Sequence, residues 1–238
     1  RELGVLQVAH YSHGRPPSEG ATGTGAEAAG VETLVVNLYI GGCSLKTHWE
    51  NMQGDLRAYH YEKNGVGMGL VSLREALTER AWDVVTFQQA SHDSGLKETY
   101  FPYLRVLSAY AKELAPGARQ FLHQTWAYAE DSTHEAFVRY HHSQSEMFAC
   151  LKAAYGEAAR ELGLPLIRSG ELVQRLRAQG LGSLCRDGFH IEIPHGRAAL
   201  ALLWLKTLSG VVSPFSPVGA DAEIMAKIRA CVAEMPEA

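Results

Sequence analysis

The chain has 238 residues, 46% of them hydrophobic and 20% charged, and its formal net charge is −4 at pH 7. This slightly acidic balance, without any basic run, excludes the nucleic-acid-binding proteins that show a basic excess. The length and the hydrophobic share suffice for one large core, so we predict a single domain over residues 1–238.

The cysteines and the hydropathy pattern exclude further classes of protein. Four cysteines are widely spaced and form no C-x-x-C pair, so neither a zinc knuckle nor a disulfide framework is indicated. No apolar run approaches the roughly 20 residues of a membrane span, and no signal-peptide pattern opens the chain. We therefore expect a soluble protein that acts away from membranes, in the cytoplasm by default. Because the chain begins with Arg1 rather than Met, an upstream segment could precede it, and the compartment stays open.

Short apolar runs alternate with helical patterns along the chain. The apolar runs predict buried strands over residues 3–9, 34–40, 82–87, 121–128 and 164–167. Apolar periodicity and capping signals predict helices over about 46–56, 72–80, 100–114, 133–162, a segment ending at 179, 194–208 and 222–232. This alternation indicates a mainly parallel, five-stranded sheet that is covered by helices on both faces and binds ligands beyond the carboxyl ends of its strands.

Three segments depart from this alternation. Residues 59–68 contain an Asn-Gly pair between short runs, which predicts a hairpin that we expect to be a surface excursion. Residues 13–30 contain five glycines and two prolines but no large aliphatic or aromatic side chain. They predict an irregular, mobile loop where a crossover between parallel strands normally carries a helix. Residues 211–238 are predicted to form a C-terminal helical tail.

An aspartate precedes a histidine by three positions at two places, Asp131 with His134 and Asp187 with His190. An imidazole becomes an effective general base when a carboxylate holds its ring in one tautomer and stabilises the imidazolium ion. The earlier pair also fits a helix capping box, because Ser132 is followed three residues later by a glutamate.

Polar clusters favour the later of the two pairs. They follow the carboxyl ends of predicted strands, at residues 10–13, 41–44, 88–92 and 123–128. Because the carboxyl ends of parallel strands lie at one edge of a sheet, these clusters converge there. The pair Asp187 and His190 lies just before the last strongly apolar segment, and we predict that it supplies the acid and base of a hydrolase at that edge.

The histidines do not indicate a metal site. The chain has 11 of them, but none lies in a His-Glu-x-x-His motif or at a comparable spacing. His141 and His142 are adjacent, and so would point to different faces of a helix. We therefore predict that no metal ion is bound.

Four sequence blocks occur in order, at residues 37–45 (NLYIGGCSL), 82–91 (WDVVTFQQAS), 123–128 (HQTWAY) and 186–190 (RDGFH). Together they resemble the SGNH (GDSL) hydrolase superfamily, and most closely a bacterial branch defined as a domain of unknown function. The resemblance covers about residues 30–208. It implies a flavodoxin-like three-layer α/β/α sandwich and a serine esterase or lipase mechanism without a cofactor. The Asp-x-x-His motif of that superfamily falls on Asp187 and His190.

The resemblance also implies an oxyanion hole, in which hydrogen-bond donors stabilise the negative oxygen of the transition state. The superfamily's glycine, whose N–H is one donor, falls on Gly42, although Gly41 and Gly42 also fit a tight turn alone. The superfamily's asparagine amide is replaced by Gln88 and Gln89. A glutamine amide donates the same kind of hydrogen bond, so we predict Gln88 or Gln89 as the second donor. Polar capping of the strand is the alternative.

The nucleophile block departs most from the superfamily, in which the first strand ends in Gly-Asp-Ser or Gly-Asn-Ser. Here the same place reads Ala9-His10-Tyr11. Ser12 follows one residue later and is the only nearby nucleophile, since a tyrosine is a poor acyl acceptor. We predict that Ser12 attacks the substrate. It also fits a plain turn residue.

The third block supplies candidate substrate contacts. We predict that His123, Trp126 and Tyr128 bind substrate, with Trp126 and Tyr128 as a wall on which a sugar stacks. Buried aromatic residues at a strand end are the alternative. The expected substrate is a small-molecule ester, such as an O-acyl group on a carbohydrate. The alternative function is a non-catalytic domain that keeps the cleft and binds a small molecule or a glycan, and the oligomeric state stays open.

The altered nucleophile block and the missing helix are contiguous, from about residue 10 to residue 25, whereas the blocks on either side are regular. One local event, such as a short shifted reading frame, would explain both changes. In that hypothesis the natural parent is a working hydrolase and this chain is impaired, because losing a serine nucleophile costs on the order of 10⁶ in kcat.

Overall fold

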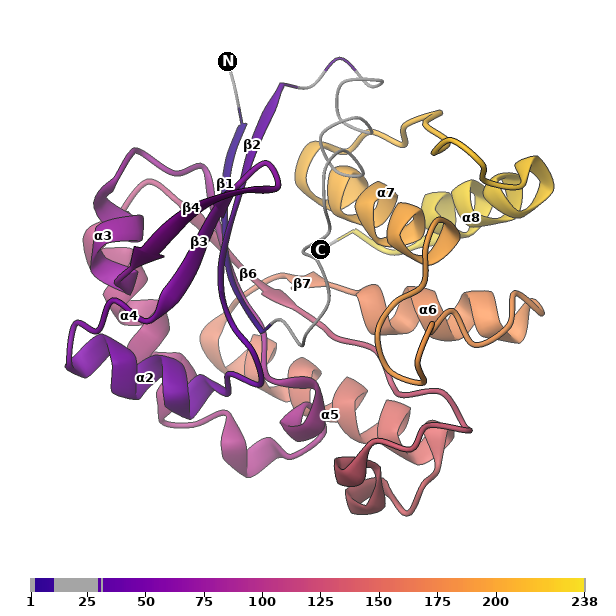
Figure 1. Cartoon of the computed structure of the whole chain (residues 1–238), viewed down its shortest axis with the longest axis horizontal. Helices are drawn as coiled ribbons and strands as arrows, with labels where there is room; N and C mark the ends of the chain where they lie inside the picture. The colour runs from indigo at the N-terminus through magenta and orange to yellow at the C-terminus, as the bar shows by residue number, and fades with distance from the viewer. Residues whose placement is uncertain (1–2, 11–29, 31, 238) are drawn as a thin grey trace.

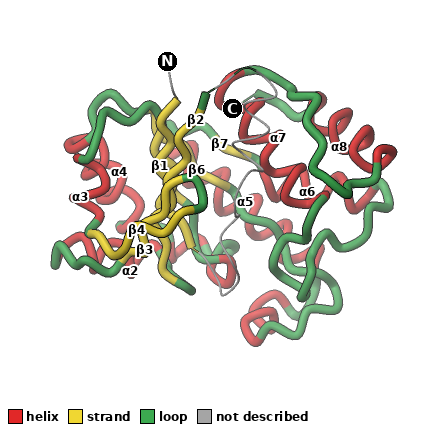
Figure 2. The backbone as a smooth tube through the Cα atoms, turned by 45° about the horizontal axis from the view of Figure 1, so that its top comes forward, coloured by secondary structure: helices red, strands yellow, loops and turns green. Residues whose placement is uncertain are grey.

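The computed structural model describes residues 3–10, 30 and 32–237. In this part of the chain, strands and helices alternate around a central sheet (Figure 1). Helices lie on both sides of the strands (Figure 2). Apart from His10 and Gly30, the predicted loop, Ser12 and the segment of the reading-frame hypothesis lie outside the described residues.

The described residues form a seven-stranded sheet with the order β4-β3-β2-β1-β5-β6-β7. The strands are β1 (Leu3–His10), β2 (Thr33–Ile40), β3 (Tyr59–Lys63), β4 (Val66–Val71), β5 (Val84–Phe87), β6 (Arg119–His123) and β7 (Leu166–Ile167). β1, β2, β5, β6 and β7 are parallel to one another, which confirms the five predicted parallel strands. β6 is shorter than predicted, because residues 124–129 continue as a loop.

The hairpin is part of the sheet, so its prediction as a surface excursion was wrong. β3 pairs antiparallel with β2, and β4 pairs antiparallel with β3. In the turn, Asn64 and Gly65 both have positive φ, 44° and 86°, which suits the twist of a tight hairpin. Asn64 also donates its backbone N–H to Val35 O at 2.8 Å and accepts from Val35 N through its side chain at 2.9 Å. These bonds hold the turn against β2 and extend the sheet by two strands.

Helices form two layers. One layer contains α2 (Leu45–Gln53), α3 (Leu73–Thr78), α4 (Tyr103–Leu114) and α5 (Gln144–Leu162), and the other contains α6 (Ser169–Ala178), α7 (His195–Ser209) and α8 (Ala222–Glu234). Short 3₁₀ helices occur in the loops after β5 and β6, namely η1 (Ser91–Asp93), η2 (Lys97–Thr99) and η3 (Glu135–Tyr140). No helix within the described ranges is long and apolar enough to span a bilayer.

Neighbouring residues on the central strands face opposite layers, because side chains alternate along a strand. Leu6 and Val85 are buried in the core beneath α2 to α5, whereas Val5 and Val84 are buried in the core beneath α6 to α8. Burial on both faces explains why these strands occur as continuous apolar runs in the sequence. The predicted tail contains α8, which belongs to the second of these cores.

Residues 133–162 do not form one helix, contrary to the prediction. After η3, His141 and His142 have positive φ, 51° and 54°, which an α-helix does not allow. α5 begins after Ser143, whose side chain accepts from Glu146 N and caps the new helix. The apolar periodicity continues across this break, so the sequence pattern did not reveal it.

Candidate active site

The carboxyl ends of the parallel strands form one edge of the sheet. β1 lies between β2 and β5, so the chain continues from β1 to one side and later returns to the other. Such a topological switch point is where open α/β sheets bind ligands. Gly42 follows β2, Gln88 follows β5 and His123 ends β6. Three predicted site residues therefore lie along this edge.

The turn that carries Asp187 and His190 has the geometry of a carboxylate–imidazole pair. His190 Nδ1 lies 2.5 Å from Asp187 Oδ2, while Asp187 Oδ1 accepts the backbone N–H of His190 at 2.8 Å and of Phe189 at 3.3 Å. A charged carboxylate only accepts hydrogen bonds, so Nδ1 of His190 is the donor in this contact. In a neutral imidazole, Nε2 then carries the lone pair that can act as a base.

The turn is fixed by its own glycine and by the loop after β6. Gly188 has φ of 88°, and a Cβ there would lie 2.9 Å from the Cα of Ser132, so only glycine fits without strain. Trp126 Nε1 donates to Phe189 O at 2.8 Å, and Ala129 N donates to Gly188 O at 2.7 Å. These bonds place the acid and base at the end of β6, on the same edge as the other candidates.

Opposing effects act on the Asp187 carboxyl. Burial raises its pKa, but hydrogen bonds from the ring and backbone N–H of His190 lower it more, so the pKa lies below the ordinary value of 3.8. A carboxyl whose pKa is depressed by folding stabilises the fold at pH values above the unfolded pKa. That contribution is lost as the pH falls through the folded pKa.

We expect the free energy of unfolding of Asp187→Asn to depend less on pH in acid than that of wild type. Wild type should lose more of its free energy of unfolding than the variant as the pH falls from 3.8 through the lower folded pKa, because only wild type must protonate Asp187. Urea denaturation of both proteins from about pH 5 to about pH 2 measures this difference. Parallel curves would contradict the assigned direction of the pKa.

The earlier Asp-x-x-His motif has a structural role. His134 Nδ1 accepts from Ala136 N at 3.1 Å, which makes His134 the cap of η3. The predicted capping box at Ser132 was therefore wrong. Ser132 Oγ instead accepts from the backbone N–H of His134 at 3.3 Å.

His134 lies beside the turn of His190, and His92 lies near His134. The ring of His134 contacts Phe189, with ring centroids 4.8 Å apart. Burial lowers the pKa of His134, and the nearby His92 and His190 lower it further. The sequence placed His134 in the earlier Asp-x-x-His motif and His92 in the polar cluster at residues 88–92, but it did not predict that the two lie close to each other. Although three histidines gather here, no group of histidine, cysteine or acidic side chains in the described part of the chain is arranged to hold a metal ion.

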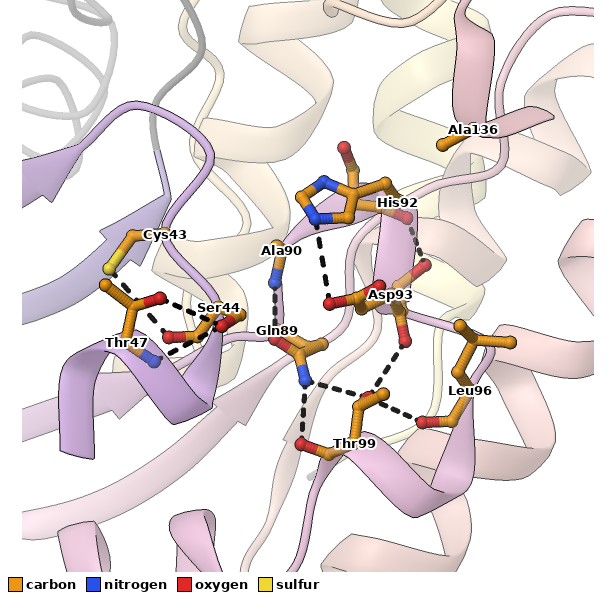
Figure 3. Close-up of polar contacts among 12 residues, drawn as sticks. Cys43, Ser44, Thr47, Gln89, Ala90, His92, Asp93, Leu96, Thr99 and Ala136 are labelled. Atoms are coloured by element: carbon orange, nitrogen blue, oxygen red, sulfur yellow. Dashed lines mark hydrogen bonds and ion pairs between the residues drawn. The ribbon is translucent and has the colours of Figure 1, made fainter. Parts of the chain in front are cut away.

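Gln89 is buried between two loops and uses its whole amide within the protein (Figure 3). Its Oε1 accepts from Leu45 N at 3.0 Å and from Ala90 N at 2.8 Å. Its Nε2 donates to the backbone O of Thr99 at 3.1 Å and to Thr99 Oγ1 at 2.9 Å. Since both amide hydrogens of Gln89 are donated to Thr99, Gln89 does not suit the predicted oxyanion role.

Gln88 belongs to a hydrogen-bonded chain along the strand ends. Its Oε1 lies 2.7 Å from His123 Nδ1, and His123 Nε2 lies 2.9 Å from Ser169 Oγ. His123 is only 9% exposed, and its ring packs edge-on against Trp204. Burial lowers the pKa of His123 to about 3, so the imidazole is neutral. Its burial and its contacts with Gln88, Ser169 and Trp204 leave little of the ring for a substrate, contrary to the prediction.

The predicted stacking wall is also different from expectation. Tyr128 is fully buried, and its hydroxyl lies 3.0 Å from Ser91 Oγ, so its ring belongs to the core rather than to a sugar-binding surface. Trp126 is half-buried and donates its ring N–H to the turn of His190. Of the two aromatic residues, only Trp126 keeps exposed ring surface near the candidate pair.

Gly42 lies in an exposed turn between β2 and α2. It has φ of 68°, and the next residue, Cys43, donates its N–H to Ile40 O at 3.3 Å. Ser44 then caps α2 by accepting from Thr47 N at 3.2 Å (Figure 3). Gly42 thus lies just before a helix N-terminus, where backbone N–H groups and the helix dipole favour negative charge.

Solved structures similar to this fold include the following three. A DUF4886 family protein from Bacteroides uniformis is 29% identical with a TM-score of 0.92, covering 98% of this chain and 94% of that chain. A protein from Slackia heliotrinireducens assigned to the SGNH hydrolases is 23% identical with a TM-score of 0.59, covering 88% of this chain and 100% of that chain. An acetylxylan esterase from Geobacillus stearothermophilus is 13% identical with a TM-score of 0.55, covering 90% of this chain and 97% of that chain.

The two less similar structures show the fold, and sequence shows the family. No curated protein matches the chain. The family model described as a domain of unknown function, DUF4886, matches residues 21–227. The chain therefore belongs to the DUF4886 family and has the fold of the SGNH hydrolases.

Proposed function

We propose that the protein is an SGNH-type serine hydrolase that cleaves an ester, with an O-acyl group on a carbohydrate as its substrate class. The observation that carries the proposal is the contact between His190 Nδ1 and Asp187 Oδ2 at 2.5 Å, in a turn held by the loop after β6. A general base held by a carboxylate is the main requirement for activating a serine. The acetylxylan esterase of the same fold supports the choice of an acylated carbohydrate.

The proposed steps use Ser12 as the nucleophile together with groups on the carboxyl edge of the sheet. Ser12 Oγ attacks the ester carbonyl while His190 Nε2 takes its proton, and Asp187 stabilises the resulting imidazolium. The N–H of Gly42 and the amide of Gln88 stabilise the oxyanion. The imidazolium then protonates the leaving alcohol, and an acyl-serine remains. Water, deprotonated by His190, attacks this acyl group and releases the carboxylic acid and the serine.

A binding domain without turnover is the second candidate. It is favoured by one observation, the sequence Ala9-His10-Tyr11 where the superfamily has its Gly-Asp-Ser or Gly-Asn-Ser motif. Such a domain would bind an acylated sugar without forming an acyl-serine. The two candidates differ in whether the serine is activated.

A fluorophosphonate probe should label wild-type protein covalently, and Ser12→Ala should abolish the label, because only an activated serine attacks phosphorus at a useful rate. Mass spectrometry of the labelled peptide would identify the residue, and turnover of p-nitrophenyl acetate and acetylated xylooligosaccharides would be measured in parallel. Ser91→Ala is the matched control on the same edge, since Ser91 Oγ lies near Tyr128 OH rather than next to a base. An unlabelled, inactive wild type that still binds acetylated xylooligosaccharides would favour the binding domain.

A further inference from the structure

The chain Ser169–His123–Gln88 links three neighbouring elements at the carboxyl edge of the sheet. Ser169 begins α6 just after β7, His123 ends β6, and Gln88 follows β5. β5, β6 and β7 are adjacent in the sheet. The contacts, 2.9 Å and 2.7 Å, therefore run along the edge toward β1.

The positions of the hydrogens in this series of hydrogen bonds follow from the burial of His123. His123 is neutral because burial lowers its pKa to about 3, so its ring carries a single N–H. The Oε1 atom of Gln88 is an acceptor without a hydrogen, and it faces Nδ1 of His123 at 2.7 Å. The N–H therefore lies on Nδ1, and Nε2 accepts from the hydroxyl of Ser169.

The N–H on Nδ1 of His123 stabilises the Gln88 amide with its carbonyl oxygen facing His123. The carbonyl oxygen is held toward β6, so the NH₂ group is directed away from His123. A flipped amide would turn its oxygen to the other side, where a lone pair would repel an oxyanion instead of stabilising it. The orientation of the Gln88 amide thus decides whether a hydrogen-bond donor or an acceptor faces the oxyanion.

We propose that His123 is a positioning residue that keeps the Gln88 amide in the orientation of an oxyanion donor, with Ser169 holding the imidazole in the required tautomer. The inference rests on the proposed hydrolase function. His123 does not touch substrate in this assignment and acts only through Gln88. Gln89 cannot replace Gln88 as the oxyanion donor, because the Gln89 amide is bonded to Thr99, Leu45 and Ala90.

A pair of substitutions at His123 separates positioning from packing. His123→Asn keeps an N–H donor near the place of Nδ1, whereas His123→Gln places its amide near Nε2 and loses that donor. We expect His123→Gln to lower kcat roughly 10²-fold with KM little changed, because a misplaced donor acts on the transition state. His123→Asn should restore most of kcat. Gln88→Glu, which keeps the acceptor toward His123 but loses the donor, should lower kcat by roughly 10²- to 10³-fold.

The tautomer of His123 is a readout that needs no turnover. ¹⁵N NMR of histidine-labelled protein should show His123 with its proton on Nδ1 and without titration between about pH 5 and pH 8. A proton on Nε2, equal losses of kcat in His123→Asn and His123→Gln at unchanged Tm, or a change in KM alone would overturn the inference. If wild type neither hydrolyses esters nor reacts with fluorophosphonate, the proposed function fails, and the NMR result still decides how Gln88 is oriented.

Discussion

Replacing His190 with alanine should lower kcat for ester hydrolysis by roughly 10⁴- to 10⁶-fold, leave KM nearly unchanged and lower Tm only modestly. The imidazole acts on protons that move only in the transition state, so its loss affects the chemical step rather than substrate binding. The ring of His190 is 17% exposed and lies on a turn, and the backbone bonds that fix the turn, at Gly188 and Phe189, do not depend on it. Steady-state kinetics with p-nitrophenyl acetate and thermal unfolding test both halves of the prediction.

His195→Ala is the matched control for this experiment. His195 also follows a carboxylate by three residues, with His195 Nδ1 3.8 Å from Glu192 Oε1. Its Nε2 accepts from Asp221 N at 2.9 Å, so its role is to hold the start of α8 rather than to transfer a proton. We expect His195→Ala to lower Tm with little effect on kcat. Comparable kcat in wild type and His190→Ala would rule out His190 as the base.

The parallel strands could be predicted because burial on both faces leaves a continuous apolar run in the sequence. The hairpin could be predicted locally from Asn64 and Gly65, but not its place in the sheet. That place depends on the bonds of Asn64 to Val35, 29 residues away in sequence. The break at His141 and His142 was hidden for a similar reason, since apolar periodicity reports which side chains are buried and not whether each φ is negative.

Some features of the candidate site could likewise be predicted from the sequence, and others could not. Asp187 and His190 could be predicted because their spacing in one turn suffices for contact. The different hydrogen-bond partners of Gln88 and Gln89 could not, since the two side chains have the same chemistry. Their partners, His123 for one and Thr99 for the other, come from other segments of the chain. Tyr128 illustrates the same limit, because an aromatic residue at a strand end is equally suited to the core or to a ligand.

Gln89→Leu should lower the free energy of unfolding by about 2–6 kcal/mol, the largest loss of stability that we expect from a polar substitution at this edge. Leucine has a similar volume, so the substitution removes hydrogen bonds without leaving a large cavity. The N–H groups of Leu45 and Ala90, both buried, lose their acceptor, and each buried, unsatisfied group costs about 1–3 kcal/mol. Urea denaturation of wild type and variant gives the difference directly.

The position of Gln89 extends this prediction from stability to activity. Leu45 begins α2 after β2, and Gln89 follows β5, so their bond joins the two strands that flank β1. Losing it should therefore loosen Gly42 relative to Gln88 and lower kcat as well as stability. Gln120→Leu is the control, because Gln120 is half-buried, its side chain bonds to Ser108 and it lies near the amino end of β6. It should cost about 1 kcal/mol without changing kcat. Equal losses of stability in the two variants would contradict the role assigned to Gln89.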